Sequence, residues 1–265
     1  MNTAPALVFL LAASACAGPA PAAAPSAPPS SMEATAPGVA SLQARAVVDA
    51  PDRIESDRRL DPGRRPAELL TFLGVAPGMR VAELVAGAGY TAELLARAVA
   101  PNGVVYAQNP QFVLEGAETP WRERLARPAA KPIVRVDREL DAPLPPEAKD
   151  LDLVVVNLVY HDTVWLGVDR DKMNQAVFAA LRKGGHYAII DHSARRGTGF
   201  ADVKTLHRVD EAAVRAEVTR AGFVLKTESN FLRNPADTRD WNDSPAVAAE
   251  RRGTSDRFAL LFVKP

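Results

Sequence analysis

The segment at 151–159, "LDLVVVNLV", limits the fold of this chain more than any other segment. Apart from Asp152 and Asn157 its residues are all apolar, and its three consecutive valines favour an extended backbone. Strands with one exposed face alternate apolar and polar residues, whereas a nearly continuous apolar run is typical of a strand covered on both faces. Such strands are parallel and need crossover connections, so we expect helices to alternate with strands along the chain.

The rest of the sequence shows this alternation. Further strands are predicted at 80–86, 104–109, 132–136 and 186–191, and helices at 39–50, 67–75, 91–100, 170–185 and 209–222. Residues 52–66 are charged and read as irregular. The last two strands, 223–232 and 256–265, have no helical pattern between them and should pair antiparallel. The pattern therefore predicts a doubly wound α/β sheet with an antiparallel pair at its end.

The N-terminal segment is expected to lie outside this fold. Residues 4–15 form an apolar run that is too short to span a bilayer, and it ends in small residues before Cys16. This resembles a bacterial lipoprotein signal peptide, which implies a signal peptide at 1–16, a lipid on Cys16 and a periplasmic or membrane-anchored protein. An ordinary cleaved signal peptide and a misassigned start are the alternatives. Residues 17–38, rich in Ala, Pro and Ser, are predicted to be a linker before a domain at 39–265.

Charge and cysteine content narrow the possible partners. The formal net charge is +0, so no basic excess indicates a nucleic-acid partner or a charged membrane surface. Membrane contact is expected only through a lipid on Cys16. Because Cys16 is the single cysteine, the chain has neither a disulfide framework nor a cysteine zinc site. A small molecule is the expected substrate, and the oligomeric state is not indicated.

A glycine turn follows the first strand of the sheet, in "VAELVAGAGY" at 81–90. Gly87 and Gly89 let the backbone approach a ligand closely, and the helix that follows offers free N–H groups to it. The letters "GAGYTA" also fit a dinucleotide fingerprint, but that pattern needs an acid about 20 residues later. Gln108 and Asn109 stand there instead. A dinucleotide site would also give no role to Glu83, the acid inside the strand. Burying a carboxylate that has no role costs folding free energy.

Glu83 and the following "LVAGAG" resemble the first motif of class I S-adenosylmethionine-dependent methyltransferases. The segments "RRPAELLTFLGVAPGMRVAEL", "YHD", "DHSA", "LHRVDEAAVRAEVTRAGF" and "LRNPAD" resemble a family of bacterial predicted methyltransferases that are often exported. This resemblance covers residues 40–265. It implies a seven-stranded sheet with the last strand antiparallel, S-adenosylmethionine as cofactor, and methyl transfer to an unidentified small molecule. The cofactor-binding residues that it implies are Glu83, Gly87, Ala88, Gly89, Tyr90, Asn109, Asp137 and Asn157.

Two departures from the methyltransferase pattern bear on activity. Val85 stands where the superfamily prefers its first glycine, and Gln108 or Asn109 stands where an acid usually binds the ribose. A neutral amide binds hydroxyl groups less strongly than a carboxylate does. Because S-adenosylmethionine is made in the cytosol, an exported chain of this kind has an alternative function as a non-catalytic ligand-binding module.

Histidine and aspartate pairs follow two neighbouring strands. His161 and Asp162 come directly after the fourth strand, and Asp191 and His192 close the fifth. With His207 they should meet on the rim beside the glycine turn, where His161, Asp162 and His192 are the candidate catalytic residues for general-base chemistry. A metal-assisted hydrolase or lyase is the alternative use of this rim, although the spacing matches no metal motif and no metal ligand is assigned.

Two further segments are candidates for the same rim. Arg64 and Arg65 precede the second predicted helix and are placed to bind the cofactor carboxylate, or simply form a solvated charged loop. Residues 233–253 are a long polar insertion before the last strand, which is either a lid or a plain connection.

Overall fold

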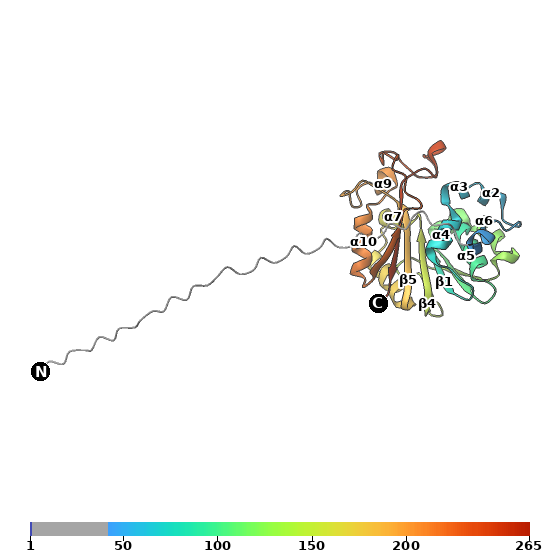
Figure 1. Ribbon diagram of the computed structural model, residues 1–265, viewed down its shortest axis with the longest axis horizontal. Coiled ribbons are helices and arrows are strands. Elements are labelled where there is room, and N and C mark those ends of the chain that lie inside the picture. The colour runs from blue at the N-terminus through green and yellow to red at the C-terminus, as the bar shows by residue number, and fades with distance from the viewer. Residues whose placement is uncertain (2–41) are drawn as a thin grey trace, which may run out of the picture. The chain divides into compact units, whose positions relative to one another are not determined.

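The computed structural model describes residue 1 and residues 42–265. The expected signal peptide, the lipidated Cys16 and the linker lie outside the described residues. Within them, seven strands make one sheet: β1 (Arg80–Leu84), β2 (Val104–Asn109), β3 (Ile133–Asp137), β4 (Leu151–Asn157), β5 (Leu181–His192), β6 (Val224–Ser229) and β7 (Arg257–Val263). The order across the sheet is β3-β2-β1-β4-β5-β7-β6 (Figure 1).

The direction of the strands confirms the predicted topology. β1 pairs in parallel with β2 and β4, and β4 pairs in parallel with β5. β7 is antiparallel to both β5 and β6. The chain winds outward from β1 to β3 and then crosses to β4, so the order of the strands reverses between β1 and β4. In open α/β sheets, ligands bind outside the carboxyl ends of the strands at such a reversal.

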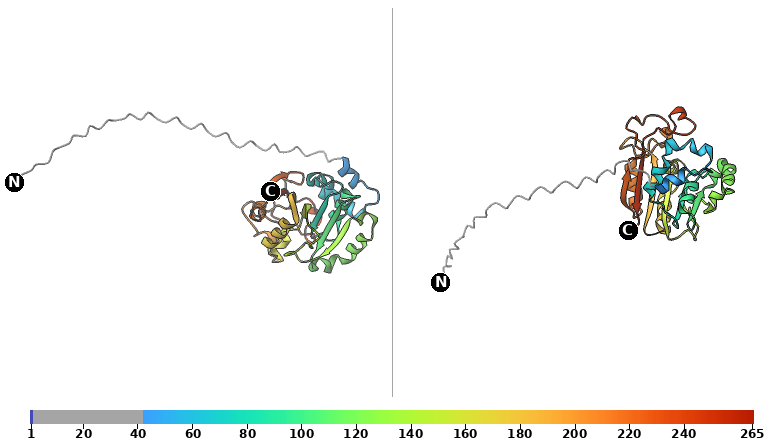
Figure 2. Two further views of the ribbon diagram at one scale, coloured as in Figure 1. Left: turned by 90° about the horizontal axis from the view of Figure 1, so that it is seen from below. Right: turned by 45° about the vertical axis from the view of Figure 1, so that its right-hand side comes forward.

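Helices cover both faces of the sheet (Figures 1 and 2). On one face lie α1 (Leu42–Val48), α4 (Pro66–Leu73), α5 (Tyr90–Val99) and α6 (Gln111–Leu125), and on the other α8 (Arg170–Ala180) and α10 (Glu211–Arg220). β4 serves both layers, since Leu153 and Val155 face the first and Val154 and Val156 face the second. The apolar run at 151–159 is therefore explained by burial on both sides, as expected.

The helix predicted at 170–185 is wrong at its C-terminal end. It stops at Ala180, and "LRKGG" belongs to β5. A Cβ atom at Gly185 would lie 2.8 Å from the Leu151 carbonyl oxygen, so this glycine serves a close approach of β5 to β4. The sequence interpretation took the same glycines for a helix stop.

The structure contains several helices of one or two turns that the sequence pattern did not predict. The segment 52–66, expected to be irregular, contains α2 (Glu55–Arg58) and α3 (Asp61–Arg64), and α7 (Tyr160–Trp165) and α9 (Val203–Leu206) flank the rim. The 3-10 helices are η1 (Pro128–Ala130) and η2 (Ala249–Arg251). Helices this short carry no apolar period. Tertiary contacts hold them instead, such as the bidentate pairing of Arg53 with Asp61 at 2.6 and 2.8 Å.

None of the helices in the part of the chain that the structure describes is long and apolar enough to cross a bilayer.

The glycine turn, residues 85–89, joins β1 to α5. Gly89 has φ 84°, and a Cβ atom there would meet the Trp121 ring and lie 2.6 Å from Cδ of Arg124. Gly87 has φ 58° but has open space around the position of a Cβ atom. Gly89 is therefore required both by the backbone and by packing, and Gly87 by the backbone alone.

We expect Gly89→Ala to lower the free energy of unfolding by about 3 kcal/mol, because left-handed strain and overpacking add together. Gly87→Ala is the matched control and should lower it by about 1 kcal/mol or less, because only the strain applies. Urea denaturation of both variants measures the difference. Equal losses in the two variants would contradict the packing argument.

Candidate active site

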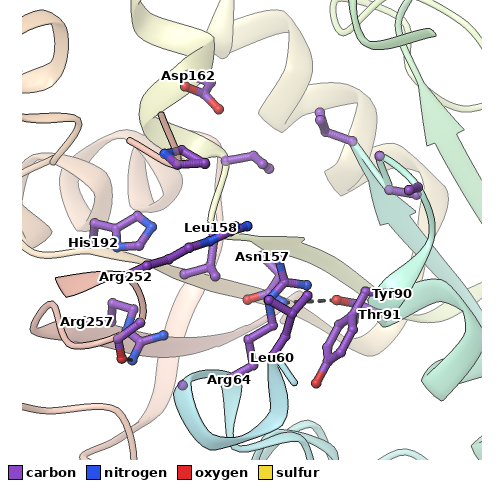
Figure 3. Close-up of a pocket in the computed structure, with 18 of the residues that line it drawn as sticks. Leu60, Arg64, Tyr90, Thr91, Asn157, Leu158, Asp162, His192, Arg252 and Arg257 are labelled. Atoms are coloured by element: carbon purple, nitrogen blue, oxygen red, sulfur yellow. Dashed lines mark hydrogen bonds between the residues drawn. The ribbon is translucent and has the colours of Figure 1, made fainter. Parts of the chain in front are cut away.

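A cleft of about 730 Å³ lies at the carboxyl ends of β1, β4 and β5 (Figure 3). Its lining comes from the glycine turn and the start of α5, the segment after β4, the short helices α2 and α3, and the loop that precedes β7, with single residues from β1 (Glu83), β4 (Asn157), α6 (Arg124), β5 (His192), the α9–α10 connection (His207) and the start of β7 (Arg257). The predicted rim residues therefore do converge. Of the predicted residues, Glu83, Gly87, Ala88, Tyr90, Asn157, Asp162 and His192 line this main cleft.

Glu83 is the buried acid of the main cleft. It is 3% exposed, and its Oε2 atom has no hydrogen-bond partner among the described residues. Burial raises the pKa of Glu83 to about 8, although hydrogen bonds from the Thr91 hydroxyl and the Ala92 N–H oppose this. Asn157 donates to Thr91 Oγ1 at 3.1 Å, so the two predicted cofactor residues Glu83 and Asn157 are linked through Thr91 (Figure 3).

Asn109 holds the glycine turn in place. Gly87 N–H donates to Asn109 Oδ1 at 2.7 Å, and Asn109 Nδ2 donates to the Gly87 carbonyl at 3.0 Å. Gln108 accepts from the Val85 N–H at 3.0 Å. Both amides are fully buried. Asn109 is therefore not brought to the main cleft, contrary to the prediction that it binds the ribose, because its amide is bound to the turn itself.

Asp137, the other predicted cofactor residue at a strand end, also lies away from the main cleft. Its side chain pairs with Arg135 at 2.9 Å on the exposed edge strand β3. Gly89 packs beneath the turn against Trp121 and does not line the main cleft.

Val85 has a backbone conformation that β-branched residues rarely adopt. Its φ is 58°, in the left-handed region that glycine prefers. Its side chain borders both the main cleft and a second cavity of about 340 Å³, the apolar pocket, which is lined by Pro110, Phe112, Val113, Leu140 and Leu166 among others. The chain therefore keeps the glycine-like turn that the superfamily motif implies, but with a valine side chain between two cavities.

Three histidines gather at the rim. The ring centroids of His161 and His207 are 4.1 Å apart, and those of His161 and His192 are 5.5 Å apart. His161 is fully buried, and its Nδ1 lies 2.7 Å from Asp191 Oδ1. Burial opposes its charge, but Asp191 and Asp162 outweigh burial and raise the pKa of His161 to about 10. His161 is thus held as a cation behind the wall of the main cleft and does not line it.

His192 is the histidine that both faces the main cleft and has an oriented ring. Its Nδ1 contacts the Asp243 carboxylate and lies 2.9 Å from Ser255 Oγ. Burial lowers the pKa of His192, although Asp243 opposes this, so the ring is neutral at pH 7. A neutral imidazole with its Nδ1 side bound to a carboxylate presents Nε2 as a proton acceptor. Asp243 was missed from the sequence because it lies in the polar insertion, 51 positions beyond His192.

His161, Asp162 and His207 could also hold a metal ion. One ligand atom from each of them lies within 4.8 Å of the others. His161 Nε2 is buried without a hydrogen bond, and it lies 3.2 Å from Asp162 Oδ1. The Asp191 carboxylate on the other ring nitrogen is the arrangement that orients metal-binding histidines.

The predicted pair Arg64 and Arg65 is divided by the fold. Arg64 lines the main cleft, with its guanidinium 4.3 Å from the ring centroid of Tyr90. Arg65 instead pairs with Glu68 and donates to the Phe231 carbonyl at 2.6 Å. Only Arg64 is therefore available to a ligand in the main cleft.

Comparison with known proteins identifies the fold. No protein-family model matches the chain, and no curated protein does either. Among solved structures, a SAM-dependent methyltransferase from Aquifex aeolicus is similar over 79% of this chain and 97% of that chain, with 18% identity and a TM-score of 0.55. The glycopeptide N-methyltransferase MtfA complexed with sinefungin is similar over 77% of this chain and 86% of that chain, with 18% identity and a TM-score of 0.52.

The protein bound to the Haloferax volcanii Trm112 methyltransferase activator in a solved complex is also similar, over 86% of this chain and 100% of that chain, with 14% identity and a TM-score of 0.56. Together with the strand order, these likenesses show that the chain has the class I methyltransferase fold. The narrower resemblance to an exported bacterial family stays a prediction.

The pairing of His161 with Asp191 gives a pH-dependent contribution to stability. The folded-state pKa of about 10 lies above the ordinary 6.5, so the contribution is complete below pH 6.5 and is lost as the pH rises toward 10. In a metal chelator, the free energy of unfolding of the unmodified protein should fall between pH 8 and pH 10, and that of His161→Gln should not show this fall. If urea denaturation gives the same pH dependence of the free energy of unfolding for both proteins, this contribution of the His161–Asp191 pair is refuted.

Proposed function

We propose that this protein transfers a methyl group from S-adenosylmethionine to a small-molecule acceptor. The observation that carries the proposal is the unpaired carboxylate oxygen of Glu83, which lies in the main cleft beside the glycine turn of a class I methyltransferase fold. A buried acid without a partner is costly, and a cationic ligand group in the cleft would supply that partner.

Residues of the chain match the parts of this cofactor. Glu83 suits the ammonium of its amino-acid end, and Arg64 suits the carboxylate of the same end. The apolar pocket beside Phe112 and Leu140 suits a purine ring. When bound, the cofactor supplies a methyl group on a sulfonium, which is an electrophile.

His192 is proposed as the general base. Its Nε2 takes a proton from the acceptor oxygen or nitrogen, while Asp243 holds the Nδ1 side and stabilises the imidazolium that forms. The other predicted catalytic residues, Asp162 and His161, are proposed to position neighbouring side chains. His161 does not line the main cleft, and Asp162 lies between His161 and His207. A proton on His161 also disfavours one on His207, whose pKa burial and this neighbour lower to about 4.

A non-catalytic binding module is the second candidate, and Val85 favours it. Its side chain stands between the main cleft and the apolar pocket, where one extended ligand would have to pass. Export of the chain, proposed from the N-terminal segment, would also separate it from a cytosolic methyl donor.

Cofactor binding should release a proton from Glu83. With a pKa of about 8, the carboxyl is about nine-tenths protonated at pH 7, and an ammonium placed against it requires the ionised form. Calorimetry of S-adenosylmethionine binding in buffers of different ionisation enthalpy should therefore show release of close to one proton. Glu83→Gln should abolish the release and weaken binding about tenfold or more, whereas Glu147→Gln, at an exposed position that lines neither the main cleft nor the apolar pocket, should change neither. Folded protein that shows no binding heat refutes the proposed function.

Replacement of the strained residue separates the two candidates. Val85→Gly relieves a left-handed backbone and opens the passage between the cavities. For a methyltransferase that already binds the cofactor, we expect affinity for S-adenosylmethionine to rise by less than about tenfold. Binding that appears only in Val85→Gly would instead identify the natural chain as a non-catalytic module.

A further inference from the structure

The main cleft has an excess of cations that lack carboxylate partners. Five arginines line it, and two of these are already paired: Arg124 with Asp57 at 2.8 Å, and Arg59 with Glu55 at 3.7 Å. Among the described residues, no carboxylate lies within ion-pair distance of the other three, which are Arg64, Arg252 and Arg257.

The acids of the main cleft do not offset this excess. Asp57 is bound to Arg124, and Asp162 lies 3.2 Å from His161 Nε2. Asp243 contacts the neutral His192 ring, so its charge offsets only one of the three arginines. Burial raises the pKa of Glu83 to about 8, so this carboxyl is mostly neutral at pH 7. The free charge in the main cleft is therefore positive.

Arg257 is the strongest indication of an anionic ligand. It is 5% exposed, and its Nε and Nη2 atoms donate to the carbonyls of Ser255 and Gly253 at 3.2 and 2.9 Å. Its Nη1 atom has no hydrogen bond to a described residue. The nearby Asp256 is committed to Arg233 and Arg239. Burial lowers the pKa of Arg257 to about 10, although the charge of Asp243, which makes no ion pair with it, opposes this.

Arg252 and Arg257 lie on the His192 side of the main cleft. Figure 3 shows both entering the pocket with His192, opposite Tyr90 and Thr91, whereas Arg64 rises toward Asn157. The position of Arg64 beside the glycine turn fits the cofactor carboxylate. The other two guanidiniums are left for a second ligand, next to the proposed base.

We infer that the methyl acceptor carries an oxyanion, a carboxylate or a phosphate, which Arg252 and Arg257 bind while its nucleophilic group lies against His192. This inference rests on the proposed methyl transfer and names the class of its acceptor. Two guanidiniums give the fork geometry that planar carboxylates and phosphates accept.

The test uses inorganic phosphate and succinate as probes, against sodium chloride at equal ionic strength. At least one probe should raise the melting temperature of the full protein in a saturable way, and the probe that does so distinguishes phosphate from carboxylate recognition. Arg257→Gln and Arg252→Gln should each weaken probe affinity about tenfold. Because Arg252 is exposed, its replacement is expected to fold normally. Arg196→Gln, which changes an exposed arginine outside the main cleft, is the matched control and should bind like the unmodified protein.

A titration with S-adenosylmethionine on the same variants keeps the two proposals distinguishable. We expect Arg252→Gln and Arg257→Gln to retain cofactor affinity and Arg64→Gln to lose it. The oxyanion inference is overturned if the protein binds the cofactor but neither probe, or if all variants bind the probes equally. Either result leaves the proposed methyl transfer intact. Probe binding that depends on Arg252 and Arg257 without any cofactor binding supports the oxyanion site and refutes methyl transfer.

Discussion

The two hydrogen bonds between the Asn109 amide and the Gly87 backbone hold the rest of the site in place. They fix the turn between β1 and α5 from the neighbouring strand, where the Asn109 side chain is fully buried. A carboxylate at 109 would accept from the Gly87 N–H but would face the Gly87 carbonyl without a proton to donate. The amide satisfies both groups, so the absence of an acid at the end of β2 follows from what this side chain does.

The charges of the main cleft come from separate parts of the chain. Glu83 is the only acidic residue of β1 and β2, and its burial keeps it mostly protonated. The loop before β7 supplies Asp243, which orients His192, and Arg252, and the first residue of β7 is Arg257; neither arginine has a carboxylate within ion-pair distance among the described residues. In the proposed reaction β1 and the glycine turn therefore contribute the cofactor side, whereas His192 at the end of β5, together with Asp243, Arg252 and Arg257 much later in the chain, contributes the acceptor side.

Sequence patterns predicted the sheet well because burial on both faces leaves a strong apolar signature. β2 was predicted with both ends correct, and the run at 151–159 contains the whole of β4. The N-terminal limit of β5 was missed because only Leu181 of "LRKGG" pairs with β4, and the polar, glycine-rich residues after it form a register shift that has no apolar alternation. Short helices were missed for the same reason, since their stability comes from tertiary contacts and not from their own periodicity.

The site was predicted less completely, because a sequence shows which residues end a strand and not where their side chains point. His161 and His192 follow neighbouring strands, yet one is enclosed and the other faces the main cleft. Asn109 and Asp137 end neighbouring strands, yet one is bound to the turn and the other to a surface arginine. Asp243 and Arg257 gave no local signal, because their roles depend on how the polar insertion folds back over the sheet.

Backbone strain around the main cleft bears on whether the site is still in use. Val85 and Leu158 line it with φ of 58° and 63°, a region that β-branched and bulky residues rarely adopt. Strain of this kind costs about 1–3 kcal/mol per residue and persists only where the surrounding structure imposes it. Both residues lie on connections at the point where the strand order reverses, which is where open α/β sheets bind ligands. Because Val85 also lines both the main cleft and the apolar pocket, it is the residue whose replacement best tests whether the site is in use.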